Sequence, residues 1–210
     1  MSASMSDILR AVAAHLFYTG IAVFFGFLMG VALDILLSRR PKLSRFVLPV
    51  LSVLNTIPGI VFVGLLFLSM GRRPATVLIA LSIYATFPVL KNTYTGLCGV
   101  DEQYKEAARG CGMNHTQRLF MVELPLAMPS IIGGLRMSTV YTVSWAVLAA
   151  MIGLGGLGDF IYRGVSSNNN VLILQGAIPA AILAFVLGSL VDALQKRVVP
   201  RGLRKAGDNK

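Results

Sequence analysis

The chain has 210 residues, of which 55% are hydrophobic and only 13% are charged, and its mean hydropathy is +0.73. Soluble domains carry about a quarter of charged residues, so this composition excludes an ordinary water-soluble domain. The net charge of +10 does not indicate nucleic-acid binding, because the basic residues cluster between long apolar runs, as is typical of membrane topology. We therefore expect an all-α membrane protein that is surrounded by a lipid bilayer and has no nucleic-acid partner.

Five apolar stretches approach the length of about 20 residues that a helix needs to cross the hydrocarbon core. In chain order they are Leu16–Leu37, Phe46–Met70, Pro74–Leu90, Pro129–Ile152 and Val171–Val191. No basic segment precedes the first stretch, so we expect it to remain as a span and not to be removed as a leader. We expect residues 1–210 to form a single transmembrane domain.

The distribution of Lys and Arg predicts the orientation. Most of them fall in the gaps after the first and third stretches and in the carboxy-terminal tail: Arg39, Arg40, Lys42, Arg45, Lys91, Lys105, Arg109, Arg118, Lys196, Arg197, Arg201, Arg204, Lys205 and Lys210. The other side holds only Arg10, Arg72, Arg73 and Arg163. Because positively charged loops stay inside, we predict that the N-terminus lies outside and the C-terminus in the cytoplasm.

Two acidic residues, Asp34 and Asp192, lie close to the predicted cytoplasmic ends of their stretches. A charged residue deep inside a span would indicate an ion or proton pathway. We interpret both as interfacial charges near basic residues.

The second stretch is interrupted near its middle by Asn55, Thr56, Pro58 and Gly59. Proline lacks a backbone donor and clashes with the preceding turn. Broken helices inside a membrane are tolerated where they line a cavity or pack in protein, and transporter sites often lie there. We place Asn55 and Pro58 on a candidate translocation pathway. The alternative is a simple kink, with Asn55 hydrogen-bonded to a neighbouring helix.

The fourth stretch carries small residues at every fourth position. They are Ser130, Gly134, Ser138, Thr142, Ala146 and Ala150. Small residues let helix backbones approach closely in lipid. The stripe predicts helix packing within this chain, against a second membrane subunit across a central pathway, or both.

The segment between the third and fourth stretches, about 99–127, is too polar to cross the membrane. Asp101 is a suitable N-cap for a short helix that runs from about Glu102 to Arg109. Gly110 and Gly112 can each supply the left-handed residue that ends such a helix.

A second short helix is predicted after the first, because Asn114 and Gln117 have the spacing of a capping box. We expect this helix to end before Pro125. The first helix has a small, weakly apolar face, formed by Tyr104, Ala107, Ala108 and Cys111. A helix that lies on lipid needs bulkier apolar residues, so this face favours docking into a partner's groove.

This loop resembles the signature of binding-protein-dependent ABC importer permeases, which is EAA, three residues, G, nine residues and I-x-L-P. The matching residues are Glu106, Ala107, Ala108, Gly112, Val122, Leu124 and Pro125, with Val122 in place of Ile as the only departure. The segments Asn55–Gly64, Ile152–Gly164 and Gly176–Ala181 are similar to the osmoprotectant branch of that family. That branch imports quaternary amines such as glycine betaine, choline and carnitine.

The resemblance implies the type I importer permease fold and a multi-pass subunit of the bacterial inner membrane. It implies that the loop couples transport to a separate ATPase, with these coupling residues: Glu106, Ala107, Ala108, Gly112, Met113, Leu124 and Pro125. The expected partners are ABC ATPase subunits, a second permease copy or a paralogue, and an extracytoplasmic substrate-binding protein. The chain has no Gly-x4-Gly-Lys-Ser/Thr motif, so we expect it to be no enzyme and to bind no cofactor, with ATP and Mg on the ATPase.

A quaternary amine has no hydrogen-bond donor on its cation, and aromatic faces are the usual way to bind it. Tyr141 and Trp145 lie one turn apart in the fourth stretch and are candidate pathway contacts. The alternative is that both rings face lipid or serve only in packing.

Other substrates and other classes remain open. Methionine, ergothioneine or another small solute would suit the same importer class. A secondary transporter or channel would require repeated spans or charges in mid-membrane, and the sequence shows neither. A metal site is not expected, because Cys98 and Cys111 form no CxxC motif and the two histidines lie far apart.

Overall fold

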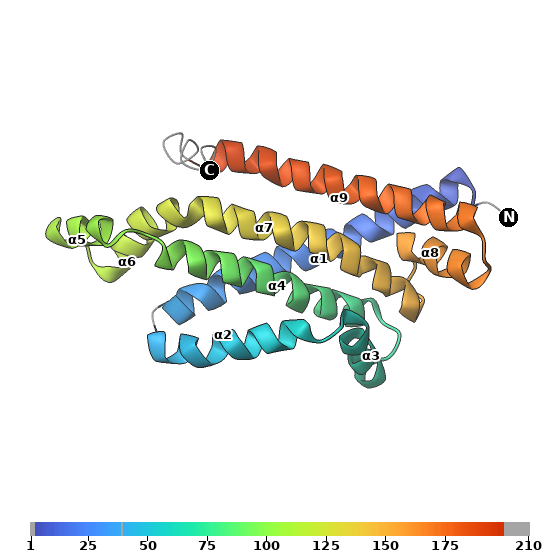
Figure 1. Cartoon of the computed structure of the whole chain (residues 1–210), viewed down its shortest axis with the longest axis horizontal. Coiled ribbons are helices and arrows are strands. Elements are labelled where there is room, and N and C mark those ends of the chain that lie inside the picture. The colour runs from blue at the N-terminus through green and yellow to red at the C-terminus, as the bar shows by residue number, and fades with distance from the viewer. Residues whose placement is uncertain (1–2, 39, 200–210) are drawn as a thin grey trace.

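Four long, apolar helices form the body of the protein in the computed structural model, which describes residues 3–38 and 40–199. Each of them is long and apolar enough to cross a membrane. They are α1 (Met5–Ser38), α4 (Pro74–Cys98), α7 (Leu124–Ala146) and α9 (Asn170–Val198). In Figure 1 their axes run along the long dimension of the molecule, with α8 (Leu157–Ser166) at one end and α5 (Glu102–Gly110) at the other. We call these the α8 end and the α5 end.

The second predicted stretch forms two helices, α2 (Pro41–Thr56) and α3 (Gly59–Met70), whose axes differ by 92°. The predicted interruption is therefore confirmed, and it is a sharp break between two helices. Counting the bent pair as one span gives up to five spans, as expected. Among the described residues every regular element is helical, which confirms the all-α fold class.

Several predicted boundaries were too narrow or shifted. The first helix begins at Met5 and not at Leu16, because its amino-terminal turns pack against α8 and α9 around Ala11 and Phe160. The third predicted span continues as helix to Cys98. The fourth stops being α-helical at Ala146 and continues as the 3-10 helix η2 (Val147–Ile152).

The small-residue stripe of the fourth stretch packs inside this chain. Gly134, Ser138, Thr142 and Ala146 are buried, and α7 lies against both α4 and α1. The Ser138 hydroxyl donates to the Ala85 carbonyl of α4 at 2.7 Å. Small side chains allow this backbone approach, so packing within the chain is confirmed for these four positions.

The two acidic residues near the helix ends differ from one another. Asp192 is half-exposed and pairs with Arg136 of α7, with a distance of 2.7 Å between Oδ1 and Nε, as an interfacial charge should. Asp34 is fully buried, and neither of its carboxyl oxygens has a hydrogen-bond partner among the described residues. Our interpretation of Asp34 as an interfacial charge near basic residues is therefore wrong. It lies on the face of α1 that also buries Gly26 and Gly30, where α1 packs on α4.

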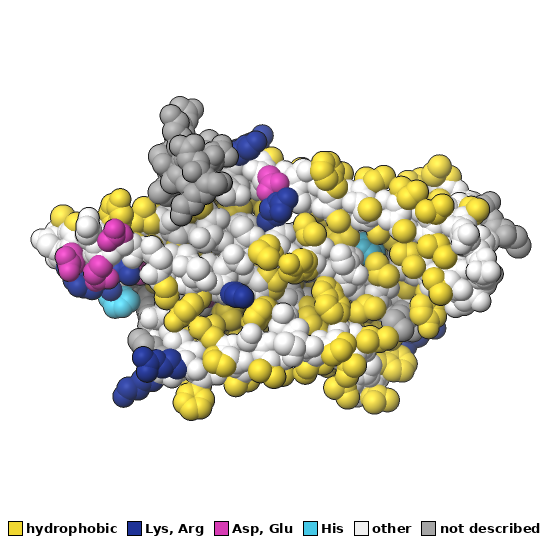
Figure 2. All heavy atoms as spheres, in the orientation of Figure 1, with side chains coloured by type: hydrophobic (Ala, Val, Ile, Leu, Met, Phe, Trp, Pro, Cys, Tyr) yellow, Lys and Arg dark blue, Asp and Glu magenta, His cyan; other side chains and the backbone are white. Residues whose placement is uncertain are grey.

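Large apolar side chains cover much of the outer surface, as Figure 2 shows along the middle of the molecule. Phe46, Leu68 and Phe185 are each more than three-quarters exposed. Acidic and basic side chains gather at the α5 end in the same view. A bundle that spans a bilayer requires such a surface, with an apolar band along its middle and charged groups beyond the band. Arg39 and the basic residues beyond 199 that entered the orientation prediction lie outside the described residues.

Candidate functional site

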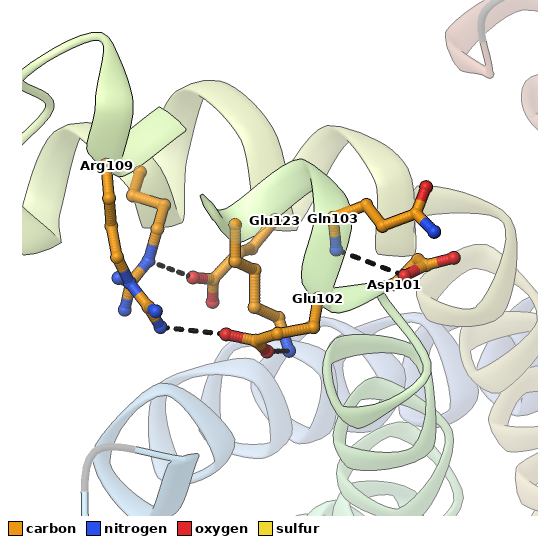
Figure 3. Close-up of polar contacts among 7 residues, drawn as sticks. Asp101, Glu102, Gln103, Arg109 and Glu123 are labelled. Carbon is orange, nitrogen blue, oxygen red and sulfur yellow. Dashed lines mark hydrogen bonds and ion pairs between the residues drawn. The ribbon is translucent and has the colours of Figure 1, made fainter. Parts of the chain in front are cut away.

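The polar loop helix α5 is closed by local interactions at its amino-terminal end. The Asp101 carboxylate accepts a hydrogen bond from the Gln103 backbone N–H at 3.1 Å, which confirms the predicted N-cap. Glu102 in the first turn pairs with Lys105 at 3.5 Å and with Arg109 at 2.8 Å (Figure 3). An acidic first turn and a basic last turn both suit the helix dipole.

Gly112 ends α5 in a left-handed conformation, with φ +77°. The Met113 N–H donates to the Ala108 carbonyl at 3.1 Å, and the Gly112 N–H donates to the Arg109 carbonyl at 2.9 Å. This pair of bonds is the Schellman motif, in which glycine is favoured at the left-handed position. The motif gives a physical reason for the fixed spacing between Ala108 and Gly112. Of the two glycines predicted as terminators, Gly112 has this role and Gly110 is the last helical residue.

The predicted apolar face of α5 is not buried as a unit. Only Ala108 turns into the chain, with 5% of its surface exposed. Tyr104, Ala107 and Cys111 remain exposed, as does Glu106. The helix therefore presents most of its surface outward at the tip of the molecule.

The second short helix, α6 (His115–Arg118), begins with the predicted capping box. The Asn114 side chain accepts from the Gln117 N–H, and the Gln117 side chain accepts from the Asn114 N–H, both at 2.9 Å. The expectation that this helix ends before Pro125 is wrong. It passes through the π-turn η1 (Leu119–Glu123) directly into α7.

The π-turn explains how the helix accommodates Pro125. Proline removes an N–H and clashes with the carbonyl four residues back in a regular α-helix. Here the Leu124 N–H donates to the carbonyl of Leu119, five residues back, so the turn before the proline is wider. Leu124 and Pro125 therefore form the first positions of α7 and lie where loop and bundle join.

An ion pair holds the π-turn together. Arg118 Nε lies 2.7 Å from Glu123 Oε1, and only 15% and 12% of the two side chains are exposed. Figure 3 shows Glu123 and the dashed line that marks this ion pair. Leu119, with 1% of its surface exposed, packs beneath them with Leu97 and Ala127. The loop is thus joined to the bundle by a continuous helix, a buried leucine and a largely shielded ion pair.

The break between α2 and α3 is held by residues that lie far away in the sequence. Ile57 and Pro58 are extended, with ψ of 126° and 131°. The Tyr84 hydroxyl of α4 donates to the carbonyl of Ile57 at 2.7 Å. The Trp145 ring of α7 lies against Gly59, where a Cβ atom would sit 1.7 Å from a ring carbon. Only glycine fits there, and four helices, α2, α3, α4 and α7, meet at this joint.

The two aromatic residues of the fourth stretch have different surroundings. Trp145 stacks on Tyr84, with ring centroids 4.7 Å apart and planes inclined by 10°. Tyr141 is 49% exposed on the surface of α7, away from that stack. Trp145 and Tyr141 are a turn apart on one helix, but only Trp145 turns towards the broken span.

A cavity of about 240 Å³ lies between α1, α2, α3 and α4, beside the break. Its lining includes Asn55, Phe62, Tyr84 and Phe87. Asn55 thus reaches a cavity, whereas Pro58 forms the cap of α3 next to it. The alternative of an Asn55 hydrogen bond to a neighbouring helix finds no support, because its side chain makes none within the described residues.

Several of these residues escaped prediction. Arg118 had entered only as a positive charge, because its spacing of five residues from Glu123 does not suit a pair on a regular α-helix and depends on the π-turn. Nothing local signals that Phe62 and Tyr84 lie near Trp145, because their contacts join distant segments. Within the described residues there is no cluster of three or more metal-binding side chains.

A bundle of long apolar helices with a broken span and a rigid polar loop at one end defines a membrane transport subunit. Residues 22–204 match the family described as "Binding-protein-dependent transport system inner membrane component", and the chain belongs to that family. It is therefore a multi-pass inner-membrane subunit of an ABC importer. It is a transport subunit and not an enzyme, since ATP hydrolysis in this family belongs to a partner ATPase.

Curated relatives resemble the chain over nearly its whole length. The carnitine transport permease protein OpuCB of Listeria monocytogenes is 44% identical and covers 91% of this chain and 88% of the relative. The glycine betaine/carnitine/choline transport system permease protein OpuCB of Bacillus subtilis is 36% identical, covering 94% and 91%. The osmoprotectant import permease protein OsmW of Salmonella typhimurium is 36% identical, covering 90% and 91%.

Solved structures share the fold. A chain of the inward-facing MetNI methionine ABC transporter has a TM-score of 0.85 and 22% identity, with 93% of this chain and 98% of that chain covered. A chain of an amino acid ABC transporter with histidines has a TM-score of 0.71 and 20% identity, covering 95% and 94%. The type I importer permease fold implied by the loop signature is thereby confirmed.

Proposed function

We propose that this chain is the permease subunit of an ATP-driven importer for quaternary-amine osmoprotectants, and that it forms the translocation pathway. The observation that carries the proposal is the high identity, over nearly the whole chain, with permeases named for carnitine, glycine betaine and choline. These three solutes share a trimethylammonium group. They differ at the other end, which is a carboxylate in two of them and a hydroxyl in choline.

The segment 99–127, with α5 at its tip, is the proposed contact with the ATPase. A helix closed by Asp101 at one end and by Gly112 at the other moves as a rigid piece. Its exposed residues Glu106 and Ala107 can contact a partner, while the hydrogen bond between Ala108 and Met113 stabilises the turn that ends α5. Leu124 and Pro125 lie where α7 begins, so a push on α5 is transmitted along a continuous helix.

The orientation and the assembly complete the proposal. The N-terminus lies outside and the α5 end faces the cytoplasm, because most Lys and Arg residues fall on the α5 side. Residues 1–210 form one transmembrane domain. The partners are ABC ATPase subunits that carry ATP and Mg, a second permease copy or paralogue, and an extracytoplasmic substrate-binding protein.

The broken span is the proposed pathway, with Asn55 and Pro58 at its break and Trp145 and Tyr141 on the neighbouring α7. Single cysteines at positions 55 and 58 test this role in a chain whose exposed native Cys98 and Cys111 have been replaced by serine. We expect both cysteines to react with a small aqueous thiol reagent in at least one nucleotide state. Protection of both in every state would remove them from the pathway.

Substrate class is tested with the partner binding protein and with the assembled transporter. A thermal-shift screen of the binding protein uses glycine betaine, choline, carnitine, ergothioneine and methionine. Uptake of the same radiolabelled solutes is then measured in proteoliposomes. We expect stabilisation and ATP-dependent uptake for the trimethylammonium solutes. A response to methionine alone would replace them with the alternative substrate.

Co-purification separates an ABC permease from a secondary carrier. The tagged chain, purified in mild detergent from cells that co-express its partner ATPase, should retain that ATPase in stoichiometric amount. ATP-independent uptake by the chain alone would indicate a secondary transporter or channel.

A further inference from the structure

The cavity beside the broken span is walled largely by aromatic rings. Phe62 of α3, together with Tyr84 and Phe87 of α4, contributes to its lining. The Phe62 and Tyr84 rings are perpendicular, with centroids 5.5 Å apart. This edge-to-face contact joins the two rings into one aromatic wall of the cavity.

The position of the central ring is fixed on two sides. Trp145 stacks on one face of Tyr84, with centroids 4.7 Å apart. The Tyr84 hydroxyl is anchored to the Ile57 carbonyl at 2.7 Å. The ring that borders the cavity is therefore pre-oriented and needs no reordering when a solute enters, which reduces the cost of binding.

The uncharged, aromatic lining of the cavity suits a cation that cannot donate hydrogen bonds. In the part of the chain that the structure describes, neither a basic nor an acidic side chain lines this cavity. A primary ammonium there would lose its water and find too few acceptors. A quaternary ammonium presents methyl groups, which pack against apolar walls, and its charge is attracted by the negative faces of aromatic rings.

Asn55 borders the cavity at the carboxy-terminal end of α2. It is exposed, and its carboxamide makes no hydrogen bond with any described residue. An amide N–H donates to a carboxylate, and an amide donates to or accepts from a hydroxyl. The volume, about 240 Å³, lies below the range of roughly 300–1,000 Å³ for pockets that hold drug-sized ligands, so the occupant is a small solute.

From these features we infer that the cavity between α1, α2, α3 and α4 is a transit site for a trimethylammonium solute, held by Phe62 and Tyr84 at its cationic end and by Asn55 at its polar end. The inference rests on the proposed function and adds a binding site within the permease itself. Trp145 is a positioning residue, because it backs the Tyr84 ring and does not line the cavity. Weak binding suits a transit site, since the solute must also leave.

The test measures uptake of radiolabelled carnitine, glycine betaine and choline by the assembled transporter in proteoliposomes with saturating binding protein. Phe62→Leu and Tyr84→Leu each remove one ring, and we expect uptake to fall about three- to tenfold. Tyr84→Phe keeps the ring and should retain most of the uptake. Phe185→Leu is the matched control, because Phe185 is 76% exposed on α9, which contributes nothing to the cavity lining.

A second set of variants separates binding by the ring from packing. Phenylalanine analogues with one, two and three ring fluorines at position 62 keep the shape and weaken the negative face stepwise. We expect a stepwise loss of uptake. A tert-butyl analogue of choline lacks the charge, so its inhibition constant should be the same for the fluorinated and the native proteins.

Three outcomes would overturn the inference. Leucine variants that transport like Phe185→Leu would show that the rings are not used. Uptake that falls in the leucine variants but is indifferent to fluorination would assign the cavity to packing or to a lipid acyl chain. A native transporter that carries none of the three solutes would overturn the proposed function, and the transit site with it, whereas the first two outcomes leave the proposed function intact.

Discussion

The loop at the α5 end and the joint between α2 and α3 are held in opposite ways. The loop is closed by bonds between near neighbours in the sequence, such as Asp101 with Gln103 and Asn114 with Gln117. The joint is closed by contacts that reach across the chain, such as the Tyr84 bond to Ile57. A locally closed segment keeps its shape when its surroundings move. A joint made by several helices must change when any of those helices shifts.

This difference suggests how motion passes through the molecule. Helix α7 begins at Leu124, directly after the π-turn of the loop, and carries Trp145 near its other end. Trp145 in turn touches Gly59 and Tyr84 at the joint. We expect a rigid displacement of the loop to move α7 and so to alter the shape of the joint. Four substitutions test the two halves of this comparison.

Gly59→Ala should have the largest effect, because a Cβ there overlaps the Trp145 ring. Overpacking of this kind costs about 3 kcal/mol. We expect a clearly lower midpoint of thermal unfolding for the purified protein. Gly64→Ala is the control, since a Cβ there meets no atom within 4 Å. Combining Gly59→Ala with Trp145→Leu should restore part of the loss, and no difference between the two alanine variants would refute the close contact.

Gly112→Val should uncouple ATP hydrolysis from uptake. A β-branched residue at φ +77° is strained by about 2 kcal/mol, although the space around it is open. The loop beyond α5 is then misdirected while the bundle remains folded. We expect ATPase activity to persist and uptake to fall at least about tenfold. Gly112→Asn tolerates the left-handed conformation and should transport well. Normal uptake by a well-expressed Gly112→Val protein would contradict this role.

Arg118→Gln should weaken the junction between loop and bundle. The pair with Glu123 is largely shielded from solvent, so its loss should cost about 1–2 kcal/mol, between the values for exposed and buried pairs. Arg109→Gln breaks the exposed pair with Glu102 and should cost less than about 0.5 kcal/mol. Thermal unfolding of the two variants side by side measures the difference. Equal effects would mean that the π-turn does not depend on its ion pair.

Asp101→Ala should have the smallest and most local effect. Loss of the N-cap costs about 1 kcal/mol, which corresponds to about fivefold faster amide hydrogen exchange in the first turn of α5. Exchange at the joint should be unchanged, because the loop is closed by its own bonds. Asp101→Ser should behave like the native protein. Faster exchange at Gly59 as well would show that the two regions are less independent than their contacts indicate.

The same contrast explains what sequence reasoning could predict. The caps at Asp101 and Asn114 and the left-handed Gly112 follow from rules that relate residues a few positions apart, and all three were predicted. Span positions follow from hydropathy over about 20 residues, so their number was predicted while their ends were not. Pro125 was misread because a π-turn upstream accommodates it, and such turns have no simple sequence signal.

The joint could be predicted only in part. Pro58 indicated a break. Neither the sharpness of the break nor the contacts that Tyr84 and Trp145 make beside it could be derived from spacing along one helix. Tyr141 and Trp145 are one turn apart on α7, and the stacking of Trp145 on Tyr84 depends on a distant segment that their spacing does not reveal. Asp34 was misread for a related reason, because its burial against α4 depends on how two distant helices pack.

The central claim is that α5 contacts the ATPase, and site-directed photo-crosslinking tests it most directly. A photoreactive residue replaces exposed Ala107 in the complex co-expressed with its ATPase, and the control position is Val165, which is 64% exposed at the α8 end. We predict a crosslink to the ATPase from position 107 and none from position 165. A crosslink from position 165, or none from position 107 in an intact, active complex, would contradict the account.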